Sequence, residues 1–599
     1  MIRPILKRIF LLIATTISVV LLLQACANRG AGPQGGIRDT TSPKLIKTSQ
    51  TNKATMATSQ QLEWVFDENI QLEKQQENIF ISPPQQKAPT ILGMGKKLSV
   101  NLTEDLVPNT TYTIDFGNAV VDLNEKNAVK DFSWSFSTGA TIDTMQLSGY
   151  VIDAQTLAPY EGITVGIYKT DSDSAFFTRS FDYIARTNST GLFTIRNIPE
   201  DNYQVFAIKD VPQAFYYDLK GKEVGFYPQS VTPQIIKQIH TDSIWNEEET
   251  PSLLRIDTVS HYSYAPTDIL IKLFREERKL TPSLKRAVRT SRESFTILLS
   301  SPLDAEPIFT PLNIQATEWL NREKTNRRDS LVYWISDSAT LALDTLRFTL
   351  SYTANDALKT DTLELNYREP RSTANKKLPN NLEISSLSKS SLDIADTLRL
   401  LVEEPIQRID KEKVQLKMRV DTTWQSVPYT LQYDDEKCKK KIDVLFERQA
   451  RASYRLELDS AAIESNYKKA SKAFLHTFTT KSPDEYATLY INWQTLPPHG
   501  IVELMDAKET VIRTQVVNES TSIFRLITPG TYFVRLILDA NQNGKWDAGT
   551  VLPKQQAEEV YYLPKKLVLR ANWESIEEWN YLAKPLLEQR AAELPKTKK

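Results

Sequence analysis

The sequence predicts an all-β protein built from tandem β-sandwich domains. Short stretches with apolar residues at every second position recur along the chain, as at residues 62–66 (Leu-Glu-Trp-Val-Phe), 112–116 and 132–136. Turn-forming residues separate these stretches at regular intervals, which is typical of a sandwich of about a hundred residues. At 599 residues the chain is too long for a single core. We therefore expect about four to six domains.

Residues 1–25 have the character of a lipoprotein signal peptide. Basic residues precede an apolar run over 9–23 that is too short for a stable spanning helix. The run leads into Leu23, Ala25 and Cys26, which resemble the lipobox of bacterial lipoproteins. That resemblance implies cleavage before Cys26 and acylation of its thiol and amine, so membrane lipid is an expected partner. At about 0.8 kcal/mol per buried CH₂, three acyl chains give lasting attachment. The alternative is an ordinary secretory signal followed by a coincidental cysteine.

Residues 26–42 are glycine-rich and nearly devoid of large apolar side chains, which favours a flexible tether ahead of the first domain. The lipobox and the domain content described below are similar to lipoproteins of the Bacteroidetes outer membrane. In that group an acidic run behind the lipidated cysteine often marks export to the cell surface, and this chain has none. The choice between the cell surface and the periplasmic face therefore stays open.

The composition argues against several functional classes. Lys and Arg (73) nearly balance Asp and Glu (74), so no overall field attracts nucleic acid, and we expect none as a partner. Only Cys438 lies beyond the lipobox cysteine, which leaves no internal disulfide. Its neighbouring lysines are expected to lower the pKa of its thiol. The four histidines lack metal-ligand spacing, which argues against a zinc hydrolase or a histidine-based triad.

No sequence motif marks an active site. A Gly-x-Ser-x-Gly elbow, a His-Glu-x-x-His helix and a phosphate-binding glycine loop are all missing from the sequence. Carboxylate pairs of the kind that glycosidases use cannot be recognised from sequence alone. We therefore predict no catalytic residues and a protein that is not an enzyme.

Residues 43–140 resemble the bacterial Ig-like domain first described in S-layer proteins of the SbsA type. The matching features are Phe66-Asp-Glu-Asn, the turn and strand at 106–112, and the closing Phe-Ser-Thr-Gly at 136–139. The loop beginning at Asp122 has the acidic and amide residues of an ion-binding loop. Side-chain capping of a turn explains it as well, and we favour the turn.

Residues 144–228 resemble the carboxypeptidase-regulatory-like domain, a transthyretin-like sandwich that accompanies other modules and is not itself catalytic. The resemblance rests on the segments at 147–153, 162–168 and 187–203. Residues 229–265 are polar, contain prolines and carry the acidic run Glu-Glu-Glu at 247–249. They are predicted to be a linker.

Two further Ig-like sandwiches are predicted at 266–370 and 378–482. Both ranges show the same alternation of apolar and polar residues. The second range ends at 474–481 in a segment that echoes the close of the first Ig-like domain, Phe-Ser-Thr-Gly at 136–139.

Residues 484–570 are predicted to be a second regulatory-like sandwich. Tyr532 precedes Asp539 by the spacing that separates Tyr203 from Asp210, and the next aspartate follows eight residues later in both copies. The two ranges therefore read as copies of one domain.

The second copy carries a candidate calcium loop. Asp539, Asn541, Asn543 and Asp547 supply oxygen donors at positions one, three, five and nine of an EF-hand-like loop, which has Gly at position six. Position twelve is Thr rather than a bidentate Glu, and the first copy lacks most of these donors. Calcium is thus a possible ligand, and the alternative is a turn held by its own side chains.

Residues 571–599 have helical composition and are predicted to be a helical tail, with Pro585 expected to kink or split it. Trp573 and Trp579 would lie on this helix and either dock on the preceding domain or contact a partner.

As a whole, the chain resembles Bacteroidetes outer-membrane lipoproteins that join an S-layer-type Ig-like domain to regulatory-like sandwiches. The resemblance implies a non-enzymatic, lipid-anchored protein that acts as a scaffold or accessory subunit of an envelope complex. The expected partner is an outer-membrane β-barrel protein, from the barrel-assembly machinery or of the SusC type, or another envelope protein. Exposed strand edges would suit such contacts. The alternative is a surface lipoprotein that binds glycan or peptidoglycan, which needs a cleft with exposed aromatic residues.

Overall fold

The computed structural model describes residues 39–169, 174–209, 215–218, 221–245, 253–277, 280–325, 327–355, 357–368 and 381–594. The predicted signal peptide, the lipidation site Cys26 and most of the tether lie outside the described residues. Within the described part, no helix combines the length and the apolar character needed to cross a membrane.

The predicted all-β architecture is confirmed. Strands dominate every described domain, and helical structure is confined to single turns. These turns are α2 (Gln75–Asn78), α3 (Ala175–Thr178), α4 (Ser338–Leu341), η1 (Lys411–Lys413), η2 (Pro483–Glu485) and η3 (Leu586–Glu588).

Domain 1 (43–140) is a sandwich with the sheets β1-β2-β6-β5 and β4-β7-β9 and the pair β3-β8. Alternation along β2 directs Leu62, Trp64 and Phe66 into the core, where each is at most 1% exposed. The strands are β1 (Leu45–Thr48), β2 (Gln61–Phe66), β3 (Ile70–Leu72), β4 (Phe80–Ser82), β5 (Thr90–Met94), β6 (Lys97–Asn101), β7 (Thr111–Gly117), β8 (Val120–Asp122) and β9 (Phe132–Ser137).

Domain 2 (144–275) has seven strands in the order β12-β11-β14-β15-β18-β10-β13. Its last strand, β18, lies beyond the predicted end of the domain at residue 228 and inside the range predicted for the next sandwich. That boundary was wrong because β18 pairs in parallel with the first strand, β10, and so completes the earlier fold. The strands are β10 (Met145–Asp153), β11 (Thr164–Tyr168), β12 (Tyr183–Arg186), β13 (Leu192–Ile198), β14 (Gln204–Ile208), β15 (Glu223–Phe226) and β18 (Ile269–Arg275).

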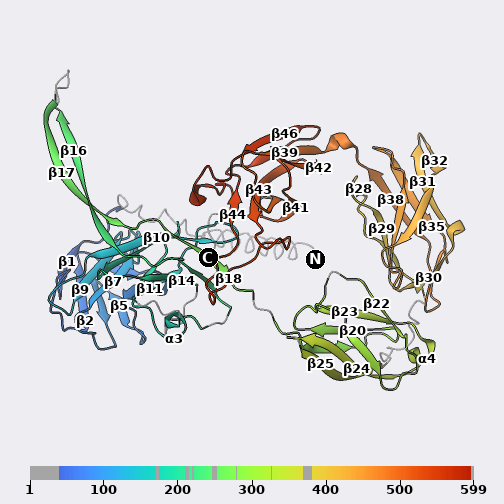
Figure 1. Ribbon diagram of the computed structural model, residues 1–599, viewed down its shortest axis with the longest axis horizontal. Helices are drawn as coiled ribbons and strands as arrows, with labels where there is room; N and C mark the ends of the chain where they lie inside the picture. Colours follow the sequence, from blue (N-terminus) through green and yellow to red (C-terminus); the bar gives the residue numbers. More distant parts are fainter. Residues whose placement is uncertain are drawn as a thin grey trace, which may run out of the picture.

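The predicted linker at 229–265 is also corrected by the structure. It holds a long antiparallel hairpin of β16 (Gln234–Trp245) and β17 (Leu253–Ala265), paired from Gln234↔Ala265 to Trp245↔Leu253. The polar composition suggested a linker, but β16 is rich in β-branched residues and β17 adds Tyr262 and Tyr264 to a few of them, and both residue types favour strands. The hairpin projects from domain 2 away from the rest of the molecule (Figure 1).

Domain 3 (283–367) packs the sheet β19-β20-β23-β22 against the sheet β21-β24-β25. Its core contains Phe295, Trp319 and Phe348. The strands are β19 (Leu284–Val288), β20 (Ser294–Leu299), β21 (Ile308–Pro311), β22 (Leu320–Arg322), β23 (Ser330–Ile335), β24 (Thr345–Ala354) and β25 (Ala357–Asn366).

Domain 4 (381–482) contains the sheets β26-β37-β36-β30, β27-β29-β34-β33 and β28-β38-β35-β31-β32 around one core. The strands are β26 (Asn381–Leu382), β27 (Ile384–Ser386), β28 (Ser391–Leu392), β29 (Leu398–Val402), β30 (Ile406–Ile409), β31 (Val414–Val420), β32 (Thr423–Ser426), β33 (Tyr429–Tyr433), β34 (Lys441–Phe446), β35 (Ser453–Leu458), β36 (Ile463–Ser465), β37 (Ala470–Ser471) and β38 (Phe474–Thr480).

Domain 5 (486–594) has the topology of domain 2. Its sheets β42-β39-β46 and β41-β40-β43-β44 correspond to β13-β10-β18 and β12-β11-β14-β15, and in both domains the last strand runs parallel to the first. The strands are β39 (Ala487–Trp493), β40 (Gly500–Met505), β41 (Val511–Val516), β42 (Thr521–Ile527), β43 (Gly530–Leu538), β44 (Val560–Tyr562), β45 (Leu567–Leu569) and β46 (Glu574–Trp579).

The predicted helical tail at 571–599 is wrong over its described part. β46 pairs with β39 from Thr488↔Glu574 to Trp493↔Trp579, and only the short turn η3 follows it. Spacings of three residues between Trp573, Ile576 and Trp579 mimicked a helix. The strand forms because burying Trp579 in the core of domain 5 and pairing with β39 outweigh local composition.

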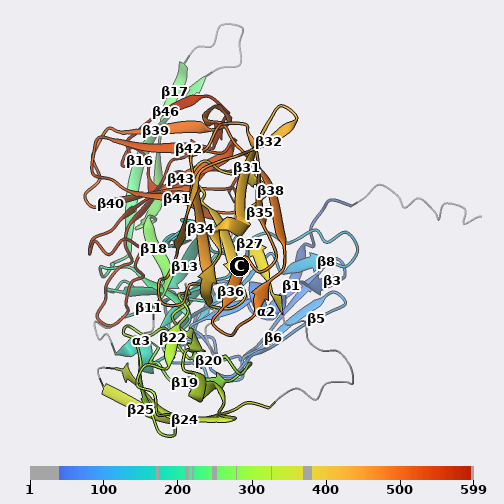
Figure 2. The same ribbon diagram turned by 90° about the vertical axis from the view of Figure 1, so that its right-hand side faces the viewer.

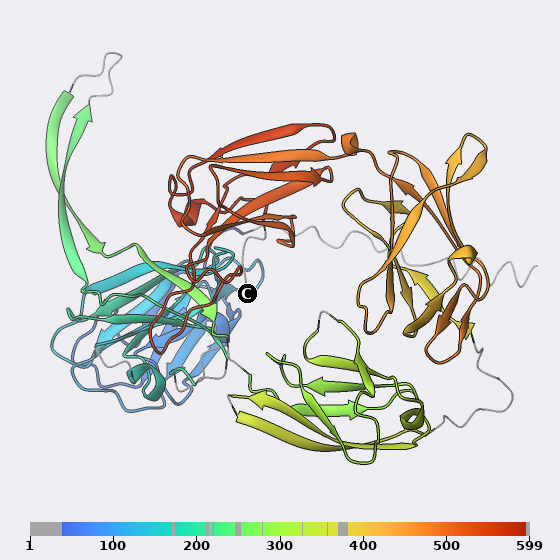
Figure 3. The same ribbon diagram turned by 45° about the vertical axis from the view of Figure 1, so that its right-hand side comes forward.

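Domains 2 to 5 form a closed ring. The chain leads from domain 2 through domains 3 and 4 to domain 5, which packs back onto domain 2 (Figure 3). Figure 2 shows the ring from its edge, with domain 4 toward the viewer. Domain 1 lies on domain 2, where the guanidinium of Arg186 donates to the carbonyls of Gln76 and Glu77.

Candidate functional site

The predicted calcium loop is closed by its own hydrogen bonds. The Asp539 carboxylate, only 4% exposed, accepts the main-chain N–H groups of Asn543 at 3.0 Å and Gly544 at 2.8 Å. The side-chain amides of Asn541 and Asn543 both donate to one oxygen of Asp547, each at 2.5 Å. The structure brings all four predicted ligands together, in the arrangement of a side-chain-held turn.

A further carboxylate, Glu558, joins this loop and was missed in the sequence. It accepts the N–H groups of Ala540 at 2.8 Å and Asp547 at 3.0 Å, and burial raises the pKa of its carboxyl group. In the described part of the chain, no group of three or more His, Cys, Asp and Glu side chains has the geometry to hold a metal ion. The residues present fit the turn better than an ion, and calcium binding stays a prediction.

The loop fastens domain 5 to domain 2. Trp546 packs against two apolar clusters that both domains share, and its indole N–H donates to the Glu558 carbonyl at 3.1 Å. Lys545 lies 3.6 Å from Glu277, and the Val551 N–H donates to Glu276 at 2.5 Å. We call the whole contact between domains 5 and 2 the clasp.

An apolar cluster forms the centre of the clasp. Ile152 and Leu157 of domain 2 contact Met505, Phe533 and Ile537 of domain 5, and the last described residues of the chain complete the cluster. All five side chains are at most 3% exposed. An interface from which solvent is excluded to this degree resembles the core of a domain more than a transient interface between domains.

The close fit of Gly549 against a side chain of domain 2 also shapes the clasp. A Cβ atom on Gly549 would lie 2.7 Å from the ring of Phe274 in domain 2 and 2.4 Å from the Gln555 carbonyl. Only glycine therefore fits where the second-copy loop meets the first copy.

An ion pair closes one side of the clasp. The Arg590 guanidinium donates to both oxygens of Glu509, at 2.8 and 2.9 Å, and to the Thr156 carbonyl of domain 2. Burial opposes the charge on Glu509, but the hydrogen bonds from Arg590 hold the pKa of this carboxyl below its ordinary value. The sequence left two possibilities for the C-terminal segment: docking on the preceding domain or contact with a partner. In the structure it docks on domain 5 and also contacts domain 2.

Two other sequence readings are decided by the structure. The Asp122 carboxylate accepts four main-chain N–H groups, from Asn124, Glu125, Lys126 and Asn127, so the favoured turn is confirmed. The expected low pKa of Cys438 is wrong. This thiol is 2% exposed, and burial raises its pKa to about 12 despite the nearby lysines.

Domains 3 and 4 meet around one tryptophan. The ammonium of Lys440 lies 4.7 Å from the ring centre of Trp334 and 3.0 Å from Glu323, which also accepts the Trp334 indole N–H at 2.9 Å. Tyr467 of domain 4 stacks on Trp334 and donates to the Ile335 carbonyl at 2.9 Å. A cation–π contact, an ion pair and a stacked ring therefore fix this junction.

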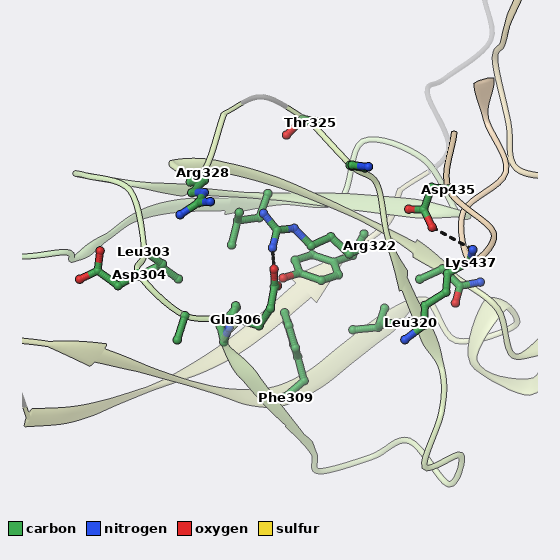
Figure 4. A pocket seen from close by; sticks show the side chains of 16 residues that line it. Leu303, Asp304, Glu306, Phe309, Leu320, Arg322, Thr325, Arg328, Asp435 and Lys437 are labelled. Carbon is green, nitrogen blue, oxygen red and sulfur yellow. Dashed lines mark hydrogen bonds and ion pairs between the residues drawn. The ribbon is translucent and has the colours of Figure 1, made fainter. Parts of the chain in front are cut away.

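A cavity of about 730 Å³, which we call the groove, lies beside this junction (Figure 4). It opens where the two sheets of domain 3 part, and a turn of domain 4 forms one wall. The lining residues are Leu303, Asp304, Ala305, Glu306, Pro307, Phe309, Leu320, Asn321, Arg322, Lys324, Thr325, Arg328, Leu331, Tyr333, Asp435 and Lys437.

The groove combines an apolar floor with a charged rim. Leu303, Leu331 and Tyr333 belong to the core of domain 3, and Arg322 forms an ion pair with Glu306 across the opening (Figure 4). The Tyr333 hydroxyl is buried without a hydrogen-bond partner among the described residues, and burial raises its pKa to about 12. No motif marked this groove, because its lining comes from three separate segments of the sequence.

Comparison with known families and structures supports the class of domain 1. Residues 39–138 match the model of a bacterial Ig-like domain. The chain is thus a multi-domain β protein that contains a bacterial Ig-like domain. No curated protein sequence matches it.

Among solved structures, domains 1–6 of the surface-layer protein SbsC align with 83% of this chain at 10% identity and a TM-score of 0.13. The aligned part is 65% of that SbsC chain, so the chain spans less than two thirds of it. The human desmocollin-1 ectodomain aligns over 86% of this chain and 96% of its own, at 7% identity and a TM-score of 0.14. Scores this low carry no argument about arrangement or function.

Proposed function

We propose that the chain is a non-enzymatic outer-membrane lipoprotein that serves as a scaffold or accessory subunit of an envelope complex. An outer-membrane β-barrel protein, from the barrel-assembly machinery or of the SusC type, is the proposed main partner. The observation that carries this proposal is the closed ring of β-sandwiches, in which the clasp joins domains 5 and 2 through a buried core.

A ring suits a scaffold because it holds several surfaces in fixed relative positions. A linear row of domains with mobile joints would lose conformational entropy each time a further domain bound the partner. In a closed ring the domains are already fixed relative to one another, so binding does not cost that entropy. Buried polar groups serve turns at Asp122 and Asp539 and the domain junction at Trp334.

Attachment would come from acylated Cys26, with the tether linking the bilayer to domain 1. We place the protein on the outer membrane and leave the leaflet to experiment. Protease treatment of intact cells separates the two possibilities, since only a surface-exposed chain would be cut.

An affinity pull-down tests the partner. The tagged chain is purified from detergent-solubilised outer membranes through a tag after Lys599, and the eluate is analysed by mass spectrometry. We expect a β-barrel protein in stoichiometric amount. A Cys26→Ser chain, which cannot be acylated, serves as the control for co-purification through shared membrane patches.

Recovery of the lipoprotein alone, also after crosslinking, would contradict the scaffold proposal. Glycan arrays would then test the alternative of a glycan or peptidoglycan binder. The described part of the chain gives that alternative little support, since the aromatic residues of the groove are mostly buried. Trp573, 59% exposed, directly precedes β46, and the Arg570 guanidinium lies 5.3 Å from its ring centre.

A further inference from the structure

Domains 2 and 5 share one topology but differ at an edge strand. β12 of domain 2 and β41 of domain 5 occupy the same place in their sheets. In domain 2 this edge is covered by domain 1, since Ile184 is 2% exposed and its N–H donates to the Ser82 hydroxyl at 3.0 Å. In domain 5, five of the six residues of β41 are exposed, among them Val511, Ile512 and Val516. The second copy therefore has an apolar strand edge that no described residue covers.

The main-chain hydrogen-bonding groups of β41 face this open edge at alternate residues. Among the described strands, β41 pairs only with β40. The N–H of Val517, which directly follows β41, donates to the Gly500 carbonyl at 2.7 Å and so points toward β40. Because these groups alternate along an antiparallel strand, those of Thr514 and Val516 point the other way, to the open edge. A free row of this kind is a template for a further strand.

β41 also has little of the charge that commonly protects an open edge. Charged side chains on edge strands discourage pairing with another chain. The only charged residue of β41 is Arg513, whereas the exposed edge strand β25 of domain 3 carries Lys359, Asp361 and Glu364. β41 is therefore the less protected of these two edges.

Gln515 of β41 supplies an independent observation. Its side-chain amide oxygen is buried and has no hydrogen-bond partner among the described residues. An unpaired buried polar atom is costly, and native structures retain few of them. A further strand with a hydrogen-bond donor opposite Gln515 would remove that cost.

The sequence of β41 makes it complementary to itself. When two copies pair antiparallel about a twofold axis at Thr514, Ile512 of each copy lies opposite Val516 of the other. In the same register Arg513 lies directly opposite Gln515 of the other copy, where its guanidinium can reach the unpaired oxygen. No like charges face each other, whereas a twofold axis at Arg513 would oppose two guanidinium groups. Both the apolar residues and the unpaired amide thus favour one register.

We propose that two copies of the chain form a dimer by pairing their β41 strands in antiparallel register about a twofold axis at Thr514. The outward N–H groups of Thr514 and Val516 then donate to the carbonyls of Thr514 and Ile512 in the other copy. The Ile512 carbonyl is accessible for this bond, since the exposed Arg513 side chain donates to it at 3.1 Å. Both copies use the same surface, so the contact closes a dimer and leaves no open edge at β41. This dimer goes beyond the scaffold proposal and does not depend on a β-barrel partner.

Disulfide crosslinking tests the register. The protein is residues 27–599, which contain every described residue, and its own thiol, Cys438, is 2% exposed. In a Thr514→Cys chain the two new cysteines face each other with Cα atoms about 5.5 Å apart, which a disulfide can span. We expect oxidised glutathione to produce a covalent dimer that dithiothreitol reverses. Val511→Cys is the matched control on the same strand, since its counterpart lies about 20 Å away along the strand, and it should not crosslink.

A mixed experiment checks the same register with two other positions. Ile512→Cys and Val516→Cys should each fail to crosslink alone, because like residues lie about 14 Å apart along the strand. A mixture of the two chains places one cysteine opposite the other and should give a covalent dimer.

Sedimentation equilibrium measures dimerisation without added cysteines. A pair of six-residue strands is a small interface, so we expect a dissociation constant of about 20–300 μM. Thr514→Pro removes an N–H that β40 does not use, at a place where edge strands tolerate proline, and should weaken dimerisation at least about tenfold. Thr514→Ala keeps the N–H and is the matched control, which should change the constant by less than about threefold.

An unmodified chain that stays monomeric up to about 500 μM would overturn the proposal, since even a weak interface associates there. So would a Val511→Cys chain that crosslinks as fully as Thr514→Cys, or a Thr514→Pro chain that dimerises like the unmodified one. Crosslinking of Thr514→Cys only to a different protein in outer membranes would also overturn the dimer and assign the edge to that protein. Circular dichroism establishes that each variant remains folded, and the cysteine experiments do not depend on the proline variant.

Discussion

At the residue scale, buried polar groups distinguish the turns from the groove. The carboxylates of Asp122 and Asp539 are both satisfied by the main chain around them. The sequence favoured a turn at Asp122, whereas at Asp539 it left a calcium loop and a turn as alternatives. Tyr333 is the opposite case, because its hydroxyl has no partner among the described residues. The alternation of β23 predicts that this side chain points inward, but only packing leaves its hydroxyl unsatisfied.

Replacing Tyr333 by Phe should therefore stabilise domain 3. The substitution keeps the ring and removes an unpaired buried hydroxyl, which should raise the free energy of unfolding by about 1 kcal/mol. Urea denaturation of the unmodified and variant chains measures the difference. Tyr352→Phe is the comparison, since the Tyr352 hydroxyl donates to Asp361 at 2.8 Å and its loss should destabilise. Equal destabilisation by both substitutions would contradict the assignment.

The ion pair between Glu509 and Arg590 should make the clasp sensitive to acid. The pKa of Glu509 is lowered in the folded protein, so its contribution to stability is fully present above the ordinary glutamate value of 4.5. This contribution to stability is lost as the pH falls through the lowered pKa that Glu509 has in the folded protein. Thermal unfolding between pH 7 and pH 3 should show this loss, and Glu509→Gln should remove that part of the pH dependence. A variant with the same profile as the unmodified chain would show that Glu509 does not contribute.

At the element scale, pairing decided two segments whose local sequence was misleading. β46 contains residues spaced as in a helix, and the hairpin of β16 and β17 has the polar composition of a linker. Strand formation depends on a partner strand that is distant in sequence, as β39 is for β46. Pairing between distant strands also explains why the observed end of domain 2 differs from the predicted one. β18 follows the inserted hairpin in sequence and pairs with β10, the first strand of the domain.

Removing the hairpin should leave domain 2 folded. The seven strands of its sheet do not include β16 or β17, and in domain 5 the equivalent connection between β44 and β46 has no such hairpin, only residues 563–573 with the short strand β45. Replacing residues 235–264 by Asn-Gly, which forms a tight hairpin turn, should shift the melting temperature by less than about 3 °C. Calorimetry measures this shift. Aggregation, or loss of the transition assigned to domain 2, would mean that the hairpin is structural.

At the scale of the whole molecule, the clasp determines the shape. Leu157→Glu places a charge in its apolar centre while leaving the core cluster of domain 2 intact, because Leu157 belongs to the interdomain cluster. Burying an unpaired carboxylate costs several kcal/mol, so the ring should open. Small-angle X-ray scattering should then show a larger radius of gyration with unchanged strand content. Leu552→Glu is the control, since that side chain is 68% exposed in the domain 5 segment between β43 and β44. An unchanged radius for Leu157→Glu would contradict a ring held by the clasp.

The sequence by itself determined the all-β class, the alternation that fills each core, the repeat shared by domains 2 and 5 and the compact turn at Asp122. These features depend on residues that are close in sequence or spaced regularly, so a single chain displays them. Only the tertiary structure decided the extent of domain 2, the strand at the C-terminal end, the clasp and the groove. Each of these is formed by segments more than a hundred residues apart or by competition between local preference and burial, and no local pattern records which segments meet.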